Sequence, residues 1–219
     1  MINMEIQYLG HSSFLIQHNG TQIIIDPYFT QGPNRLVKPG ADPRELKPRF
    51  VLVTHEHFDH CDPQAIRMFV KRSNAKVIGP APVERKTDLK IVKVRPGMTL
   101  KYDDFTLIVT PAFHKQSEFP IGFLLDFDGF RIYHAGDTYY NKKLEDINTD
   151  IALLPIGGTY TMDIDEAVKL AHGIGASVTI PMHYQTFENI MADPAEFAKQ
   201  VKGAVVLPIG EVIELGSKD

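Results

Sequence analysis

Four side chains within one short stretch, His55, His57, Asp59 and His60, can each bind a metal ion. Imidazole nitrogens and carboxylate oxygens together suit zinc, manganese or iron(II). Residues two apart on an extended segment point to the same side, so one cation can collect His55 and His57. Asp59 and His60 come after the turn and are free to face a second cation. Three of the nine histidines of the chain fall within these six positions, which argues against a chance cluster on an exposed loop.

The residues on either side of this stretch are suited to holding it in place. Residues 50–53 are an apolar run rich in β-branched side chains, which is typical of a buried strand. Residues 64–70 have a helical pattern. The sequence therefore predicts a metal-binding loop between the end of a buried strand and the start of a helix.

Strand patterns dominate the rest of the chain. Asn19-Gly20 and Asp128-Gly129 favour tight hairpin turns of type I′, in which both central residues have positive φ. Many strands with few helices indicate two sheets packed face to face, with helices on the outer faces. We expect strands at residues 4–9, 14–18, 22–25, 50–53, 76–79, 91–94, 99–102, 105–110, 121–127, 130–133, 151–155, 177–180, 204–207 and 211–215. We expect helices at residues 64–70, 163–172 and 194–201, with Asp163 capping the second and Gly173 ending it.

Residues 28–48 are rich in glycine and proline and show no periodic pattern. Long loops of this kind are often functional lids or substrate walls, although a plain surface excursion explains the pattern equally well.

Length and composition limit the class of protein. The 219 residues, 43% of them hydrophobic, predict one domain over residues 1–219 with a sizeable core. A net charge of −4 does not favour a nucleic-acid partner, and no apolar run is long enough for a membrane span. One cysteine and no visible signal peptide favour a cytoplasmic protein without an internal disulfide. The sequence leaves open whether the chain forms a homo-oligomer.

Three further candidate ligands each follow a predicted strand. His114 and His183 stand at strand ends, and Asp137 follows Gly136, which lets the backbone turn tightly. A carboxylate can bridge two cations because its two oxygens can serve one each. A single histidine at a strand end is usually structural, so these residues become strong candidates only together with the stretch from His55 to His60.

The pattern H-x-H-x-D-H resembles the signature of the metallo-β-lactamase superfamily, which adds a later His, a later Asp after Gly and a final His near the C-terminus. The resemblance implies an α+β (α/β) fold, a four-layer αββα sandwich. It also implies two divalent metal ions, Zn, Mn or Fe. His55, His57 and His114 would then bind the first metal, Asp59, His60 and His183 the second, and Asp137 would bridge them.

Residues 9–13, 24–28 and 181–184 resemble one branch of that superfamily. It holds small uncharacterised metal-dependent hydrolases, ascorbate-6-phosphate lactonase and N-acylphosphatidylethanolamine phospholipase D. The resemblance implies a small-molecule substrate with a lactone or phosphodiester bond. His11 either lines the active site as a catalytic residue or makes a structural hydrogen bond, and Tyr184 is a substrate-binding candidate.

Other residues near the motif receive supporting or neutral interpretations. Asp26 is placed to orient a ligand, and His134 to support one. Cys61 is interpreted as a neighbour of the ligands. His18 and His172 are expected at the surface.

The expected activity is binuclear metal-dependent hydrolysis. Two ions ~3.5–4 Å apart would share a hydroxide whose pKa falls toward ~7, and Asp59 would orient it. The alternative is a non-hydrolytic metal-binding or diiron-type redox member of the same fold. A β-lactamase is disfavoured by Asp137, because such enzymes commonly carry Cys there, and a tRNA-processing nuclease by the absence of a basic insertion. The physiological substrate and the metal remain open.

Overall fold

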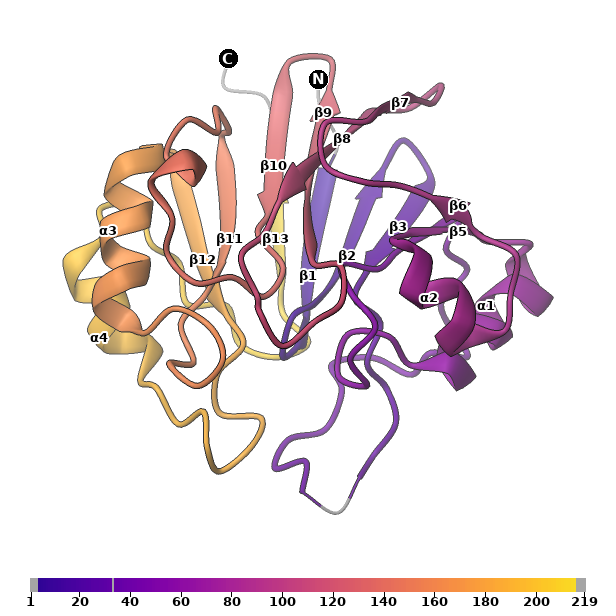
Figure 1. The fold of residues 1–219 in the computed structure, drawn as a ribbon, viewed down its shortest axis with the longest axis horizontal. Helices are drawn as coiled ribbons and strands as arrows, with labels where there is room; N and C mark the ends of the chain where they lie inside the picture. The colour runs from indigo at the N-terminus through magenta and orange to yellow at the C-terminus, as the bar shows by residue number, and fades with distance from the viewer. Residues whose placement is uncertain (1–3, 33, 216–219) are drawn as a thin grey trace. The chain divides into compact units, whose positions relative to one another are not determined.

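The computed structural model describes residues 4–32 and 34–215, which fall into two compact units (Figure 1). Unit 1 contains the described residues up to Val94 and those from Leu207 onward, and unit 2 is Arg95–Val206. The expectation of one domain over residues 1–219 stays a prediction. No helix within the two described ranges is long and apolar enough to cross a membrane.

Unit 1 is built on a seven-stranded sheet with the order β13-β1-β2-β3-β4-β5-β6. The part from β13 to β3 is antiparallel, and the part from β3 to β6 is parallel. Asn19 and Gly20 have φ of 48° and 79°, so the predicted hairpin turn is confirmed. The strands are β1 (Met4–Gly10), β2 (Ser13–His18), β3 (Thr21–Ile25), β4 (Phe50–Leu52), β5 (Lys76–Gly79), β6 (Val92–Lys93) and β13 (Val212–Leu215).

Two helices connect the parallel strands of unit 1, because parallel neighbours need a crossover. Helix α1 (Pro63–Ser73) joins β4 to β5, and α2 (Ala81–Thr87) joins β5 to β6; the two lie side by side (Figure 1). The sequence analysis missed α2. This helix is only seven residues long and its N-cap, Pro80, offers no side-chain hydrogen bond, so it carries neither a clear period nor a capping signal.

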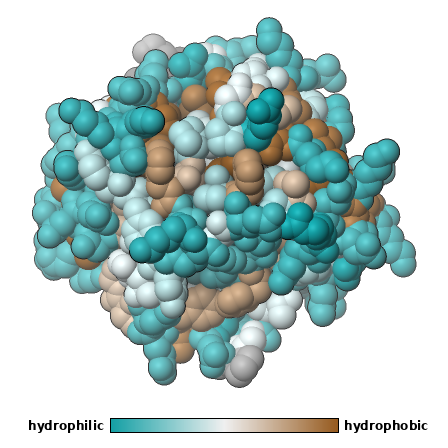
Figure 2. Space-filling view, in the orientation of Figure 1, coloured by the Kyte–Doolittle hydropathy of each residue, from teal (hydrophilic) through white to brown (hydrophobic). Residues whose placement is uncertain are grey.

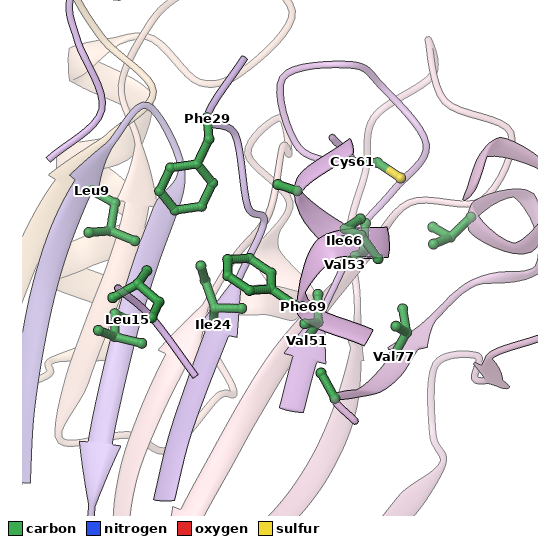
Figure 3. Close-up of a cluster of buried hydrophobic side chains, with 14 of the residues drawn as sticks. Leu9, Leu15, Ile24, Phe29, Val51, Val53, Cys61, Ile66, Phe69 and Val77 are labelled. Carbon is green, nitrogen blue, oxygen red and sulfur yellow. The ribbon is translucent and has the colours of Figure 1, made fainter. Parts of the chain in front are cut away.

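An apolar cluster fills unit 1 between the sheet and α1 (Figure 3). The ring of Phe29, from the long loop, packs edge-on against that of Phe69 in α1 with centroids 6.0 Å apart. Cys61 is fully buried in this cluster, and burial raises the pKa of its thiol to about 12. The thiol therefore stays protonated near neutral pH. Other members of the cluster are Leu9, Leu15, Ile24, Val51, Val53, Ile66 and Val77.

Unit 2 is built on a six-stranded sheet with the order β12-β11-β10-β9-β8-β7. Strands β10, β11 and β12 are parallel, and the other pairs are antiparallel. Asp128 and Gly129 have φ of 53° and 97°, which confirms the second predicted hairpin turn. The strands are β7 (Thr99–Lys101), β8 (Thr106–Pro111), β9 (Ile121–Phe127), β10 (Phe130–His134), β11 (Ile151–Pro155) and β12 (Val178–Met182).

Helices α3 (Ile164–Ile174) and α4 (Pro194–Gln200) pack against each other in unit 2, and a short 3-10 helix, η1, spans Lys142–Leu144 (Figure 1). Asp163 caps α3 as predicted, since its side chain accepts a hydrogen bond from the Glu166 backbone N–H. Each unit therefore contains one sheet and one pair of helices. The sheet and the helix pair of a unit correspond to two layers of the predicted four-layer αββα sandwich.

Two local predictions in unit 2 are wrong. Gly173 does not end α3; the helix continues to Ile174 and ends at Gly175, whose φ is +67°. Residues 204–207 are not a strand, because only Ala204 makes a single bridge, to Thr179. Pro208 has no N–H to offer, and the turn at Gly203 brings the chain alongside β12 for one residue pair only.

The loop of residues 28–48 is held at both ends. The Oδ2 atom of Asp62 accepts hydrogen bonds from Phe29 N, Thr30 N and Thr30 Oγ1 at 3.1, 2.7 and 2.8 Å. Its Oδ1 atom accepts from the first turn of α1, so one carboxylate joins the loop to the helix. Near its other end, the Lys47 N–H donates to the Gln22 side chain at 2.8 Å. These contacts favour a fixed wall over a mobile lid.

We expect Asp62→Ala to lower the free energy of unfolding by about 2–4 kcal/mol, because it removes a helix cap and leaves loop donors without their acceptor. Asp193→Ala is the matched control, since Asp193 caps α4 through Ala195 N without holding any loop, and should cost about 1 kcal/mol or less. Urea denaturation measures both variants. Equal losses in the two would show that the loop contacts add nothing.

Candidate metal centre

In unit 1, the predicted ligand stretch forms a compact turn between β4 and α1. The His57 carbonyl accepts hydrogen bonds from His60 N at 3.1 Å and from Cys61 N at 2.8 Å, which closes the turn. His55 and His60 are fully buried, and the side chain of Asp59 is 15% exposed. The strand, loop and helix predicted around this motif are therefore present.

His55 and His57 are arranged as two ligands of one ion would be. His55 Nε2 and His57 Nδ1 lie 3.1 Å apart, with the rings edge-on. Two nitrogens that each lie about 2.1 Å from one zinc ion are themselves about 3.0–3.4 Å apart, from octahedral to tetrahedral geometry. This pair fits a single cation.

The buried carboxylate of Asp26 holds two of the candidate ligands. Its Oδ1 accepts from Thr54 N at 2.7 Å, and its Oδ2 accepts from Thr54 Oγ1 at 2.7 Å and from His60 Nδ1 at 2.8 Å. Thr54 Oγ1 also lies 3.0 Å from His55 Nδ1. Asp26 and Thr54 are both fully buried, so water does not compete for these bonds.

These contacts fix the proton positions on both imidazoles. An ionised carboxylate only accepts, so Thr54 donates its hydroxyl proton to Asp26 and its oxygen accepts from Nδ1–H of His55. His60 likewise donates from Nδ1–H to Asp26. The Nε2 atoms of His55 and His60 then carry lone pairs, the form that binds a metal. The donor set therefore fits a divalent cation.

His11 lies against Asp59 in unit 1. His11 Nε2 is 3.1 Å from Asp59 Oδ2, and candidate ligand atoms of His11, Asp59 and His60 all lie within 4.8 Å of one another. The Tyr8 hydroxyl donates to the His11 carbonyl at 2.9 Å and so supports its left-handed backbone, φ +59°. Both interpretations of His11 are compatible with this position, since it lies beside a candidate ligand and contacts that ligand at hydrogen-bond distance.

In unit 2, Asp137 lies beside the two candidate histidines of that unit. Its Oδ2 is 3.2 Å from His183 Nε2 and 4.0 Å from His114 Nε2, and all three side chains are buried. His114 Nδ1 lies 3.0 Å from the Tyr160 carbonyl, which can only accept. The proton of His114 is therefore on Nδ1, and Nε2 is available to a metal ion. The Asp137 carboxylate therefore lies beside both candidate histidines of unit 2.

The backbone that carries Asp137 is supported by His134. The Gly136 N–H donates to His134 Nδ1 at 3.1 Å across the turn after β10. His134 is fully buried, which agrees with the supporting role predicted for it.

His183 is packed against Gly157. A Cβ atom on Gly157 would lie 2.4 Å from the His183 carbonyl oxygen and 2.9 Å from His183 Nδ1, so only glycine fits. A surface hollow of about 300 Å³ opens beside Gly157, Gly158 and the first residues of α3.

Tyr184 follows His183, and burial raises the pKa of its hydroxyl to about 12. This hydroxyl stays protonated at neutral pH and can donate a hydrogen bond.

Two other histidines, His172 and His18, were both predicted to lie at the surface, and only the first does. His172 is exposed as predicted, with Nε2 3.0 Å from the Gln200 carbonyl. His18 was expected at the surface but is only 8% exposed, because it ends β2 between the neighbouring strands β1 and β3.

Sequence reasoning missed two supports of the ligands. Thr54 carried a weak signal, a hydroxyl residue directly before the first histidine of the motif. The Tyr160 carbonyl that holds His114 carried none, because every residue has a carbonyl.

The chain is similar to known proteins over most of its length. Residues 5–183 match the sequence profile of a family described as the beta-lactamase superfamily domain. A UPF0173 metal-dependent hydrolase of Thermoplasma acidophilum is 38% identical over 94% of this chain and 93% of its own. A UPF0173 metal-dependent hydrolase of Archaeoglobus fulgidus is 35% identical over 96% of this chain and 99% of its own. The solved structure of Igni18, a metallo hydrolase of Ignicoccus hospitalis, is 31% identical over 99% of this chain and 100% of its own, with a TM-score of 0.85.

We expect Asp26→Asn to weaken divalent-metal affinity about 10- to 100-fold, because an amide cannot accept from Thr54 and His60 as the carboxylate does. Competition with a chelator measures the affinity, and nitrogen NMR of the imidazoles measures the proton positions on His55 and His60. Asp126→Asn is the matched control, since Asp126 accepts from Gly129 and Arg131 on a hairpin without touching a candidate ligand. Wild-type affinity together with unchanged imidazole signals in Asp26→Asn would contradict the assignment.

Proposed function

Because this chain belongs to the β-lactamase superfamily and is a metal-dependent hydrolase, we propose that it uses two divalent metal ions to hydrolyse an ester-type bond in a small molecule. The superfamily, the enzyme class and the α+β fold class predicted from the sequence are confirmed by the same similarities. The number of metal ions and the bond belong to the proposal.

The seven residues predicted from the sequence are proposed as ligands. His55, His57 and His114 would hold one ion, Asp59, His60 and His183 the other, and Asp137 would contribute to both. The observation that carries this assignment is the Asp26 network, which presents the Nε2 lone pairs of two buried imidazoles. The 3.1 Å spacing of the His55 and His57 nitrogens and the contacts of Asp137 with His114 and His183 support it independently.

In this proposal the metal ions and the side chains of the protein supply different parts of the chemistry. When bound, two divalent ions supply Lewis acidity and a nucleophile at neutral pH. Asp59 orients that nucleophile, and His11, 3.1 Å from Asp59, takes part in proton transfer with it. Tyr184, protonated at neutral pH, donates a hydrogen bond to the negative charge that develops on the substrate.

A lactone or a phosphodiester is the proposed bond. The test is turnover of γ-butyrolactone, p-nitrophenyl acetate and bis-p-nitrophenyl phosphate by protein loaded with zinc or with manganese. Hydrolysis of a lactone or phosphodiester supports the proposal. Absence of turnover in the whole panel, together with metal-dependent oxygen consumption, would favour a redox role for the same fold.

We expect about two equivalents of metal per chain in reconstituted wild-type protein, and about one in either His55→Ala or His183→Ala, because these ligands belong to different ions. Elemental analysis measures the content, and both variants should lose turnover. His172→Ala is the matched control, because His172 is exposed and remote in sequence from the ligands. Fewer than one equivalent in the wild type would overturn the binuclear assignment.

Asp137→Asn should lower kcat by at least ~10²-fold while about one metal ion stays bound, because a neutral amide cannot bridge two cations. Metal content and kcat are measured on the same sample, with the substrate that the wild type cleaves in the panel. Unchanged kcat with two ions bound would show that Asp137 is not the bridge.

A further inference from the structure

We propose that the exposed ring of Phe58, backed by the buried ring of Tyr28, forms an apolar subsite, the aromatic wall, which binds the hydrocarbon chain of an acyl substrate beside the ligands of unit 1. This inference rests on the proposed function and adds a substrate class to it, a hydrophobic acyl ester or lactone.

Phe58 presents a large apolar surface next to the candidate ligands. It stands between His57 and Asp59, and 58% of it is exposed, more than any other large apolar side chain in the described ranges. The loop around it is closed by the hydrogen bonds to the His57 carbonyl, so its backbone is fixed. A molecule that approaches Asp59 or His57 can therefore contact the exposed part of this ring.

Tyr28 supports Phe58 from beneath and also contacts the His11 ring. Its ring meets the Phe58 ring edge-on with centroids 5.9 Å apart, and the His11 ring at the same separation. Tyr28 itself is only 3% exposed. The Asp62 N–H donates to the Pro27 carbonyl at 3.2 Å, which ties the start of the long loop to the residues after the ligand turn. The two rings are therefore set by the same framework as the ligands.

Arg35 holds Tyr28 from within the long loop. Its guanidinium lies over the Tyr28 ring, 4.0 Å from the centroid, and Nη1 donates to the Tyr28 carbonyl at 2.8 Å. Its Nε donates to the Val37 carbonyl at 2.8 Å. Arg35 is 5% exposed and forms no ion pair with a described carboxylate, and its Nη2 is buried without a hydrogen bond. Burying a cation without an ion pair costs free energy. This cost indicates that Arg35 serves to hold the Tyr28 ring in place through the cation–π contact.

Isolated exposed apolar side chains are normal on protein surfaces, so exposure alone would not carry this inference. The face drawn in Figure 2 is mainly hydrophilic, with hydrophobic surface in separate areas. In unit 2, too, exposed apolar residues occur on the loops that carry ligands. Tyr160, whose carbonyl holds His114, is 52% exposed, and Met191, after His183, is 56% exposed. The same kind of side chain thus accompanies candidate ligands in both units.

An acyl chain is the occupant that fits these observations. The exposed part of the wall is a hydrocarbon ring, and Arg35, the cation that stacks on Tyr28, is buried and directs its hydrogen bonds to backbone carbonyls. Each methylene group buried against such a wall is worth about fourfold in affinity. A substrate with a chain of several carbons would therefore be preferred over a short one.

The first test measures binding without metal or turnover. Calorimetry on metal-free protein compares octanoate with butyrate, in the wild type and in Phe58→Ala. Octanoate should bind the wild type at least about tenfold more tightly than butyrate, and Phe58→Ala should remove most of that preference. Phe58→Leu should retain it. Met98→Ala and Val212→Ala, each a truncation of an exposed apolar side chain remote in sequence from the ligands, should leave it unchanged.

The second test measures kcat/KM for p-nitrophenyl octanoate relative to p-nitrophenyl acetate, with metal content determined on the same samples. The ratio should exceed about ten in the wild type and fall in Phe58→Ala. An equal ratio in the two proteins, or equal affinity of the wild type for octanoate and butyrate, would overturn the subsite. Ester cleavage without chain-length preference would leave the proposed function standing and remove the subsite. Octanoate binding that depends on Phe58, without turnover of any lactone, ester or phosphodiester in the panel, would leave the subsite standing and remove the proposed function.

Discussion

The carboxylate of Asp26 is the constraint on which the candidate ligands of unit 1 depend. It is fully buried, and an ionised carboxylate in the interior must accept hydrogen bonds or destabilise the fold. Its three donors are Thr54 N, Thr54 Oγ1 and His60 Nδ1. Satisfying the carboxylate therefore forces the protons of His60 and, through Thr54, of His55 onto Nδ1. The requirement that stabilises the core also prepares two imidazoles for a cation.

Four residues at or beside the candidate ligands have a left-handed backbone conformation, as do five other non-glycine residues of the described chain, most of them at hairpin turns and helix ends. His11, Asp26, Tyr160 and His183 all have φ between 48° and 70°, a conformation that side chains other than glycine rarely adopt. Such residues cost about 1–3 kcal/mol each and persist where surrounding contacts hold them. The Tyr8 hydroxyl supports His11, and the Asp26 N–H donates to the Leu52 carbonyl at 2.9 Å. Each of these four residues either is a candidate ligand or directly contacts one.

The candidate ligands follow strand ends in both units. His55 and Asp137 come after β4 and β10, and His114 and His183 come after β8 and β12. A strand fixes the direction in which the next residues leave the sheet, so short loops at strand ends present side chains precisely. This arrangement explains why the chain repeats one local pattern, an apolar run followed within a few residues by His or Asp.

The sequence by itself determined most of the strands, the two hairpin turns and the candidate ligands, because period-two apolar patterns, Asn-Gly and Asp-Gly pairs and the H-x-H-x-D-H spacing are local signals. It wrongly predicted a strand at residues 204–207. It did not determine α2, which lacks a capping side chain, or the end of α3 at Gly175 rather than Gly173. Tertiary structure alone decided which nitrogens of His55, His60 and His114 are available. The partners of His60 and His114 lie 34 and 46 residues away in sequence, and the hydroxyl of Thr54 beside His55 is oriented by Asp26, 28 residues away. The partner of His114 is a backbone carbonyl, which no residue type reveals.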